Sequence, residues 1–271
     1  MRKPDLYAVI DFETKQDLEI LDSTFPSDKF APPIAHEVIA ISMATFRREP
    51  FPNDHMLEIK SLGSARGSEA EMLNTVVEFI SKKRPCLVGW NNRGFDSEVL
   101  KLRCLKYGIA FPTWFQTGTK WESYRQRYST DWQLDLMDFL TAFGASPKFS
   151  LDLASRAIGF PGKYGISGKD VAQYYADGRL DEIVAYCETD VAATAGLMLR
   201  VLHLTGDLSS DGFTKSAKAF LDYLTVKAEE KAHLREFLKL VDIDKFTSIF
   251  TNLEDQTLAD NVREFPRGVS K

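Results

Sequence analysis

The sequence predicts an α/β fold in which a five-stranded mixed sheet is flanked by helices. Short apolar segments rich in β-branched and aromatic residues are separated by turn residues, and longer segments carry apolar residues at helical spacing. The first three strands follow one another through short connections, which favours an antiparallel meander. The later strands alternate with helices, which favours parallel pairing through right-handed crossovers. Together these patterns indicate a mixed sheet.

The elements follow from local signals along the chain. Strands are predicted at 6–14, 36–46, 56–61, 86–90 and 132–137. Helices are predicted at 69–83, 95–107, 138–143, 151–158, 168–177 and 180–204. Ser68 and Glu71 form a capping-box pattern, Ser150 and Ser167 are predicted N-caps, and glycines stand at helix ends.

Two units are predicted, a domain over residues 1–205 and a C-terminal helical extension over 206–271. The extension is amphipathic and highly charged over 215–241. Such a pattern is compatible with packing back onto the domain and with joining two copies of the chain. The amphipathic pattern does not choose between them.

Composition places the chain among globular proteins and excludes several classes. No run of the 271 residues is long and apolar enough to cross a bilayer, and no apolar signal core follows Met1, so we expect a cytoplasmic protein without a membrane partner. Its three cysteines, widely spaced, are expected to be reduced thiols. The net charge of -5 argues against coating nucleic acid through bulk positive charge.

Carboxylates stand at three separated places that together indicate a functional site. Asp11 and Glu13 alternate on a strand and so share one face, with Cα atoms about 6.6 Å apart. Asp96 lies in the first turn of a helix, where the helix dipole favours its ionised form. Tyr186 and Asp190 are four apart on a helix and share a face. Each alone is explained by a strand end, an N-cap or a surface acid, whereas their conjunction points to chemistry.

The segments around these residues carry a family resemblance. V-I-D-F-E-T, N-N-R-G-F-D and Y-C-E-T-D resemble the three motifs of the DnaQ-like, or DEDD, 3′–5′ exonucleases of the RNase H-like fold. The nearest subgroup is the predicted PolB-like 3′–5′ exonucleases, which have similar L-D-L-M-D and S-L-D-L-A segments. No histidine lies four or five residues ahead of Asp190, so the resemblance is to the tyrosine subtype. It covers residues 6–204.

The resemblance implies two divalent ions, Mg²⁺ or Mn²⁺, and a role for each motif residue. Asp11 is the ligand shared by both ions, and Glu13 binds one of them and positions the attacking water. Asp96 and Asp190 complete the site, and the hydroxyl of Tyr186 orients the water. Charge independently favours cations here, because like charges 4 Å apart repel by about 4 kcal/mol at an effective dielectric near 20. Oxygen ligands suit magnesium or manganese better than zinc.

Substrate contacts are expected beside these motifs. The expected substrate-binding residues are Phe12, Thr14, Asn92, Arg93, Phe95, Lys148 and Ser150. The stretch 111–128 interleaves aromatic and basic residues, which suits stacking of unpaired bases and equally suits a packed insertion. Residues 93–127 carry seven basic and three acidic side chains, so the local charge is +4.

The resulting hypothesis is a metal-dependent enzyme that removes nucleotides from 3′ ends, with single-stranded DNA favoured and RNA also compatible. One alternative is an exoribonuclease acting on short RNA, because the motifs do not indicate whether the sugar of the substrate is deoxyribose or ribose. The other is a catalytically silent nucleic-acid-binding or scaffold module of the same fold. A separate polymerase or repair complex is a compatible partner, and the sequence does not choose among repair, proofreading and viral replication.

Overall fold

The computed structural model describes residues 3–22, 24–26, 29–48, 56–63, 67–162 and 165–249, so residues 250–271 of the predicted extension lie outside it. Its elements in chain order are β1 (Leu6–Gln16), η1 (Pro33–Ala35), β2 (His36–Arg47), β3 (Met56–Gly63), α1 (Glu69–Lys83), β4 (Cys86–Gly89), α2 (Asp96–Tyr107), α3 (Pro112–Gln116), β5 (Gln133–Asp135), α4 (Leu136–Leu140), η3 (Ala142–Gly144), α5 (Leu151–Ala157), α6 (Val171–Ala176), α7 (Leu180–Leu204), α8 (Ser210–Glu230), α9 (Ala232–Lys239) and α10 (Ile243–Thr247).

The predicted five-stranded mixed sheet is confirmed, with strand order β3-β2-β1-β4-β5. β1, β2 and β3 form the antiparallel meander, while β4 pairs in parallel with both β1 and β5. β4 does not pair with β3, the strand before it in sequence. The crossover through α1 carries the chain past β2 to the far side of β1, so β4 pairs with β1 instead. β1 therefore lies in the middle of the sheet and pairs with strands of both directions.

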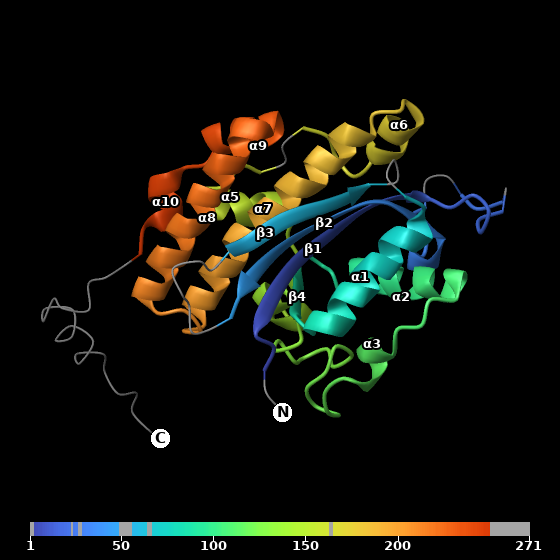
Figure 1. The fold of residues 1–271 in the computed structure, drawn as a ribbon, viewed down its shortest axis with the longest axis horizontal. Helices are drawn as coiled ribbons and strands as arrows, with labels where there is room; N and C mark the ends of the chain where they lie inside the picture. Colours follow the sequence, from blue (N-terminus) through green and yellow to red (C-terminus); the bar gives the residue numbers. More distant parts are fainter. Residues whose placement is uncertain are drawn as a thin grey trace, which may run out of the picture.

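Helices cover both faces of this sheet (Figure 1). Even-numbered residues of β1, such as Ala8 and Ile10, pack with α1 and α2 in one core cluster. Odd-numbered residues, such as Tyr7 and Val9, pack with α7 and α8 in the other. The alternation of a strand buried on both faces accounts for this division. It also places Asp11 and Glu13 on the face that carries α7.

Most helix ends follow the sequence signals, but two predicted starts are wrong. The capping box at Ser68 and Glu71 is present, and Gly108 ends α2 in the left-handed conformation. The helix expected at 138–143 begins at Leu136, because Asp135 caps it and ends the preceding strand there. The predicted cap at Ser167 is wrong, because α6 begins only at Val171 and its N-cap is Asp170. The hydroxyl of Ser167 instead donates to the Asp170 carboxylate over 2.7 Å, which stabilises a turn ahead of the helix.

The C-terminal extension packs back onto the domain, which answers the question that its amphipathic pattern left open. α8, α9 and α10 bury the rings of Phe213, Phe220, Phe237 and Phe246 in the same cluster as α7. The hydroxyl of Tyr223 accepts the backbone N–H of Ile59 over 2.8 Å and so joins α8 to β3. The described helices therefore share one core with the sheet.

The free, buried state of Cys86, Cys104 and Cys187 agrees with the expected reduced thiols. Among the described helices, none combines the length and apolar character that crossing a bilayer requires.

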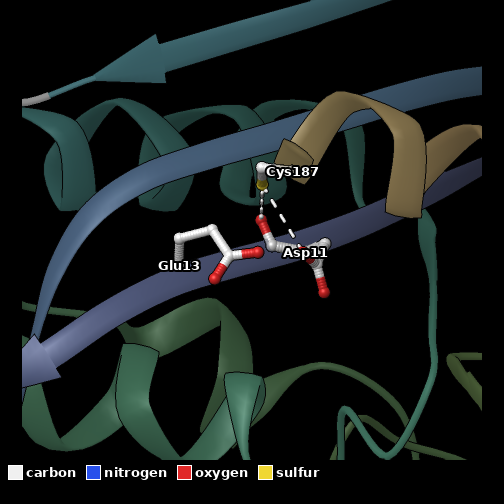
Figure 2. A group of neighbouring side chains, drawn as sticks. All are labelled: Asp11, Glu13 and Cys187. Carbon is white, nitrogen blue, oxygen red and sulfur yellow. Dashed lines mark hydrogen bonds between the residues drawn. The ribbon is translucent and has the colours of Figure 1, made fainter. Parts of the chain in front are cut away.

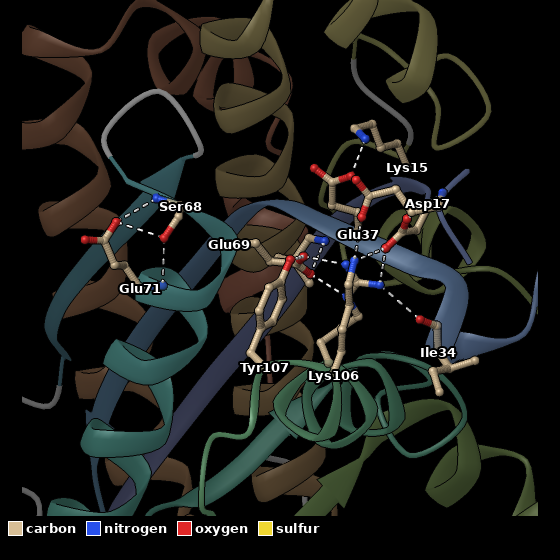
Figure 3. Close-up of polar contacts among 12 residues, drawn as sticks. Lys15, Asp17, Ile34, Glu37, Ser68, Glu69, Glu71, Lys106 and Tyr107 are labelled. Carbon is tan, nitrogen blue, oxygen red and sulfur yellow. Dashed lines mark hydrogen bonds and ion pairs between the residues drawn. The ribbon is translucent and has the colours of Figure 1, made fainter. Parts of the chain in front are cut away.

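A buried ion-pair network fixes α1 and α2 to the connection after β1 (Figure 3). The Arg103 side chain is fully buried and contacts Asp17 at 2.6 Å and Glu69 at 2.5 Å. Glu69 also accepts from the Tyr107 hydroxyl over 2.7 Å, and Lys106 contacts Asp17 at 2.5 Å. Although burial opposes ionisation, hydrogen bonds from these cations lower the pKa of Asp17 to about 2. One guanidinium thus neutralises acids from two distant segments.

Replacing Arg103 with Met should destabilise the fold by about 3–5 kcal/mol, because the change leaves two buried carboxylates without their main partner. Urea unfolding at pH 7, followed by circular dichroism, measures the change. Lys82→Met is the matched control, since it breaks an exposed ion pair with Glu78 that is worth less than about 1 kcal/mol. Equal losses in the two variants would contradict the assignment.

Candidate active site

β1 carries Asp11 and Glu13 toward α7 at the centre of the sheet. Their carboxylate oxygens and the thiol sulfur of Cys187 all lie within 4.8 Å of one another. Figure 2 shows the Glu13 carboxylate turned toward Asp11, with the sulfur of Cys187 beside both. The ladder with β2 shifts register between Glu13 and Thr14, a β-bulge of the kind found beside active sites.

Asp96 reaches the same place from the turn after β4. β4 ends at Gly89, and its ladder with β1 extends only to Val9, so β1 continues past it. The N–H of Phe12 lies on this uncovered stretch and donates to Oδ1 of Asp96 over 3.1 Å. Gly89 permits the close approach, because a Cβ atom there would lie 3.1 Å from the carbonyl oxygen of Ile10. Because β4 does not pair with this part of β1, the N–H of Phe12 is free to hold the carboxylate of Asp96.

α7 brings Tyr186 and Asp190 against the same end of β1. Val191 and Ala195 of this helix are fully buried against the sheet, whereas Tyr186 and Asp190 are half-buried on its open side. Burial, followed by the charge of Asp190, raises the pKa of the Tyr186 hydroxyl. Tyr186 therefore stays protonated at neutral pH and can donate a hydrogen bond.

The carboxylates perturb one another strongly. Burial raises the pKa of Asp11, and the charges of Asp96 and Asp190 raise it further. Burial and the charge of Asp11 do the same for Glu13. The pKa of Asp96 rises to about 7, mainly because the group is buried. Asp11, Glu13 and Cys187 therefore place ligand atoms within 4.8 Å of one another, while Asp96 and Asp190 lie near enough for their charges to raise the pKa of Asp11 and Glu13. No cation of the described chain lowers either pKa.

Such a site fits a hard divalent cation. Asp11, Glu13, Asp96 and Asp190 offer oxygen atoms, which suit magnesium or manganese. A bound cation would relieve the repulsion that raises the pKa values. Cys187 adds a sulfur, but burial and the neighbouring Asp11 raise its pKa, so the thiol is protonated and acts as a donor.

Cys187 belongs to the site, although its sequence pattern predicted only a buried position on α7. Its thiol donates to the backbone oxygen of Asp11 over 3.4 Å and lies 3.5 Å from the Asp11 carboxylate. Ser42 of β2 hydrogen-bonds Cys187 from the other side and lies 2.9 Å from the Ser61 hydroxyl. The sequence signal that could have placed Cys187 in the site is its position three residues before Asp190.

The turn between β4 and α2 is held by an acid that sequence analysis did not single out. The buried Asp135 carboxylate accepts the N–H groups of Asn91 and Arg93 at 3.1 and 2.9 Å, and that of Asp138 at 3.1 Å. The side chain of Asn92 is fully buried within this turn and finds no hydrogen-bond partner among the described residues. The backbone leading to Asp96 is thereby fixed.

Three of the expected substrate-binding residues, Phe12, Thr14 and Phe95, differ in what surrounds their side chains. The Phe12 ring is buried in the cluster beneath α1 and α2, so only its backbone faces Asp96. The Thr14 hydroxyl lies 2.9 Å from Nδ1 of His36, and the Phe95 ring packs edge-on against that histidine at 4.8 Å. Phe30, which sequence analysis missed, packs against both rings in a tilted orientation and is 75% exposed. Its isolated position in a polar connection gave no signal.

The remaining expected contacts lie beyond the carboxylates. Arg93 donates to the backbone oxygens of Ser129 and Gln133. Ser150 caps α5 by accepting the N–H of Leu153 over 3.2 Å, and Lys148 is exposed just before it. The four carboxylates and Tyr186 are thus near enough for charge to perturb their pKa values, whereas the hydrogen bonds of Arg93 and Ser150 described here are made to other residues.

The aromatic and basic stretch 111–128 divides between core and surface. Trp114 and Tyr124 are buried and stack with ring centroids 5.2 Å apart. Phe115, Trp121 and Tyr128 are 51, 69 and 67% exposed. Both interpretations of the stretch thus hold for part of it, since some rings fill the core and others face solvent.

Glu188, two residues before Asp190, anchors the C-terminal helices to α7. It is 2% exposed and accepts from Ser61 over 2.6 Å, Lys231 over 2.6 Å and His233 over 2.7 Å. Burial favours its neutral form, but these donors prevail and lower its pKa to about 2. The junction of α8 and α9 is thereby tied to the helix that carries Tyr186 and Asp190.

Comparison with known proteins identifies the family. Residues 28–241 match the model of a predicted 3′–5′ exonuclease related to the exonuclease domain of PolB. This chain belongs to that family. The description of the family, a predicted 3′–5′ exonuclease, agrees with the predicted enzyme class. The match begins after β1, so Asp11 and Glu13 are placed by the structure rather than by the family model. No curated protein matches the chain.

One solved structure of low sequence identity shares the fold of this chain. The chain resembles the family B DNA polymerase from the hyperthermophilic archaeon Pyrobaculum calidifontis, with 17% identity and a TM-score of 0.53, over 83% of this chain and 29% of the polymerase. It also matches exonuclease I, with 18% identity and a TM-score of 0.38, over 82% of this chain and 43% of that one. The chain thus spans less than half of either protein. The expected RNase H-like exonuclease fold is confirmed.

Replacing Glu188 with Gln should destabilise the protein by about 1.5–3 kcal/mol at pH 7, because the donors lose a charged acceptor. The folded-state pKa of about 2 is below the ordinary value, so the stabilisation is complete above pH about 4.3. It is lost as pH falls toward 2. Urea unfolding of parent and variant between pH 7 and pH 2 measures the difference.

Glu182→Gln is the control, since this exposed acid of α7 pairs only with Arg179 in the described structure. Its effect should stay below about 1 kcal/mol. A difference between the parent and Glu188→Gln that persists unchanged to pH 2 would refute the anchoring role.

Proposed function

We propose that this exonuclease hydrolyses single-stranded DNA from its 3′ end, using two Mg²⁺ or Mn²⁺ ions. The observation that carries the proposal is the meeting of four carboxylates from three segments, with mutually raised pKa values of Asp11 and Glu13. A silent binding module gains nothing from such a costly arrangement, which makes catalysis the better explanation.

Each residue has a role that its surroundings support. Asp11 is the central ligand that the family resemblance implies, and the charges of Asp96 and Asp190 act on it as they act on Glu13. Glu13 completes the ligand set and accepts a hydrogen bond from the attacking water. Bound ions would supply an activated water and neutralise charge at phosphorus and at the leaving 3′ oxygen.

Tyr186 positions the water rather than removing its proton. Its raised pKa keeps the hydroxyl hydrogen in place, which suits a donor and excludes a general base at neutral pH. Cys187 holds the backbone of Asp11 through its thiol and so limits movement of the central ligand. The exposed ring of Phe30, beside Phe95, offers a face on which a terminal base can stack.

Replacing Asp11 with Asn should abolish hydrolysis of a 5′-labelled oligonucleotide with a free 3′ end, because the change removes the ligand common to both ions. The loss should exceed the roughly 10–100-fold expected for an outer-shell partner. Gel analysis under Mn²⁺ measures it, with circular dichroism as a check on the fold. Asp181→Asn, an exposed change on α7, is the control and should retain activity. Turnover of Asp11→Asn at the parent rate would refute the site.

Binding of manganese tests the cofactor separately from turnover. Calorimetric titration of the parent should reveal two ions per chain and a raised unfolding temperature, since cations relieve the repulsion among the carboxylates. Asp11→Asn should lose at least one binding event. Equal titrations of the two proteins would exclude Asp11 as a ligand.

The nature of the sugar is decided by comparing DNA and RNA oligonucleotides of equal length and sequence. We expect the larger kcat/KM on single-stranded DNA, with mononucleoside 5′-phosphates as products on chromatography. A larger value on RNA would replace the proposal by an exoribonuclease at the same site.

A further inference from the structure

A hollow of about 500 Å³ lies beside the carboxylate site, between α2 and the segment that follows it. Figure 1 shows that segment, which includes α3, on the side of the sheet that carries α1 and α2, away from α8. None of the four carboxylates lines the hollow. It is therefore a concave site distinct from the candidate active site.

The hollow gathers positive charge in an acidic protein. Five cations line it, namely Arg93, Lys101, Arg125, Arg127 and Lys148, against the two acids Glu98 and Asp138. The balance is five minus two, or +3, whereas the whole chain carries -5. Such a local excess attracts anions although the protein as a whole repels them.

Three of these cations form no ion pair in the described part of the chain, and one of them, Arg93, is held instead by the backbone oxygens of Ser129 and Gln133. Lys101 pairs with Glu98 at 2.5 Å, and Arg127 lies 3.4 Å from Asp138. Arg125 and Lys148 are exposed and form no ion pair with any residue of the described ranges. Their charges remain available for a ligand that carries phosphate groups.

The walls of the hollow are polar as well as aromatic. Gln133 is 1% exposed, and its amide donates to the Ser97 hydroxyl over 2.6 Å. Trp114 is 2% exposed, and its indole N–H has no hydrogen-bond partner among the residues that the structure describes. Phe115, half exposed, completes the lining. A buried unpartnered donor next to cations and an open ring suits a phosphorylated ligand with flat bases.

The hollow is continuous with the turn that leads to the carboxylates. Gly94 and Ser97 line it, and Asp96 lies between them in sequence with its carboxylate on the N–H of Phe12. A strand whose 3′ end reaches Asp96 has its earlier nucleotides within reach of the hollow. A polyanionic strand accounts for both the cations and this continuity.

We propose that this hollow binds the phosphodiester backbone of the single strand upstream of the 3′-terminal nucleotide, which rests on the proposed exonuclease function. Arg125 and Lys148 contact phosphates, and Phe115 supports a base. The contact is made to phosphate and is independent of base sequence. It makes affinity depend on the length of the strand.

The test compares fluorescent oligo(dT) of about 4 and about 16 nucleotides. Anisotropy titrations in EDTA give Kd without hydrolysis, and assays with Mn²⁺ give KM and kcat. The test variant is Arg125→Ala/Lys148→Ala. The control, Lys215→Ala/Lys218→Ala, removes two charges from α8 on the other side of the sheet. All of these positions are exposed, so the fold should be retained, as circular dichroism checks.

The double variant should raise Kd and KM for the long strand about tenfold, leave kcat unchanged, and leave the short strand unaffected. The slope of log Kd against log salt concentration should become shallower by about 0.7 for each phosphate that the variant no longer neutralises. Unchanged Kd for the long strand, or equal losses of affinity for both lengths, would overturn the proposal while hydrolysis by the parent continued. A parent that binds with this length dependence but hydrolyses neither strand would instead overturn the proposed function.

Discussion

Repulsion among carboxylates at one end of β1 is the constraint on which the rest of the structure depends. Asp11, Glu13, Asp96 and Asp190 come from a central strand, a turn and a long helix, and each of these is held by contacts outside the site. β1 is fixed by strands on both sides, Asp96 by the N–H of Phe12, and α7 by its buried face. The contacts of the fold offset the free energy of repulsion between these like charges. Burial and this repulsion raise the pKa of Asp11 and Glu13.

The same protein neutralises its other buried acids internally, and the contrast is informative. Asp17 and Glu188 are as buried as the site acids, yet cations and hydroxyl groups lower their pKa values to about 2. Among the described residues, neither Asp11 nor Glu13 has a cation or hydroxyl partner that lowers its pKa, and Asp11 accepts only the thiol of Cys187. Buried carboxylates left without a neutralising cation are typical of a functional site.

Local signals made much of this predictable. The stripe of apolar residues along 180–204 gave the limits of α7, and the capping box gave the start of α1. Contacts between distant segments were not predictable, because periodicity describes one element at a time. The neighbour of β4, the hydrogen bonds of Cys187 and the partners of Glu188 all depend on how sheet and helices meet. The cap expected at Ser167 failed because a short turn competed with the helix for the same side chains.

The link between Glu188 and the α8–α9 junction limits how far the chain can be truncated from its C-terminal end. Sequence motifs end near residue 204, which invites a minimal nuclease that stops there. Such a fragment would leave Glu188 without Lys231 and His233 and would strip aromatic rings from the outer face of α7. We therefore expect the smallest fragment that folds to include the helices up to α10, because the part that carries the motifs depends on contacts with them.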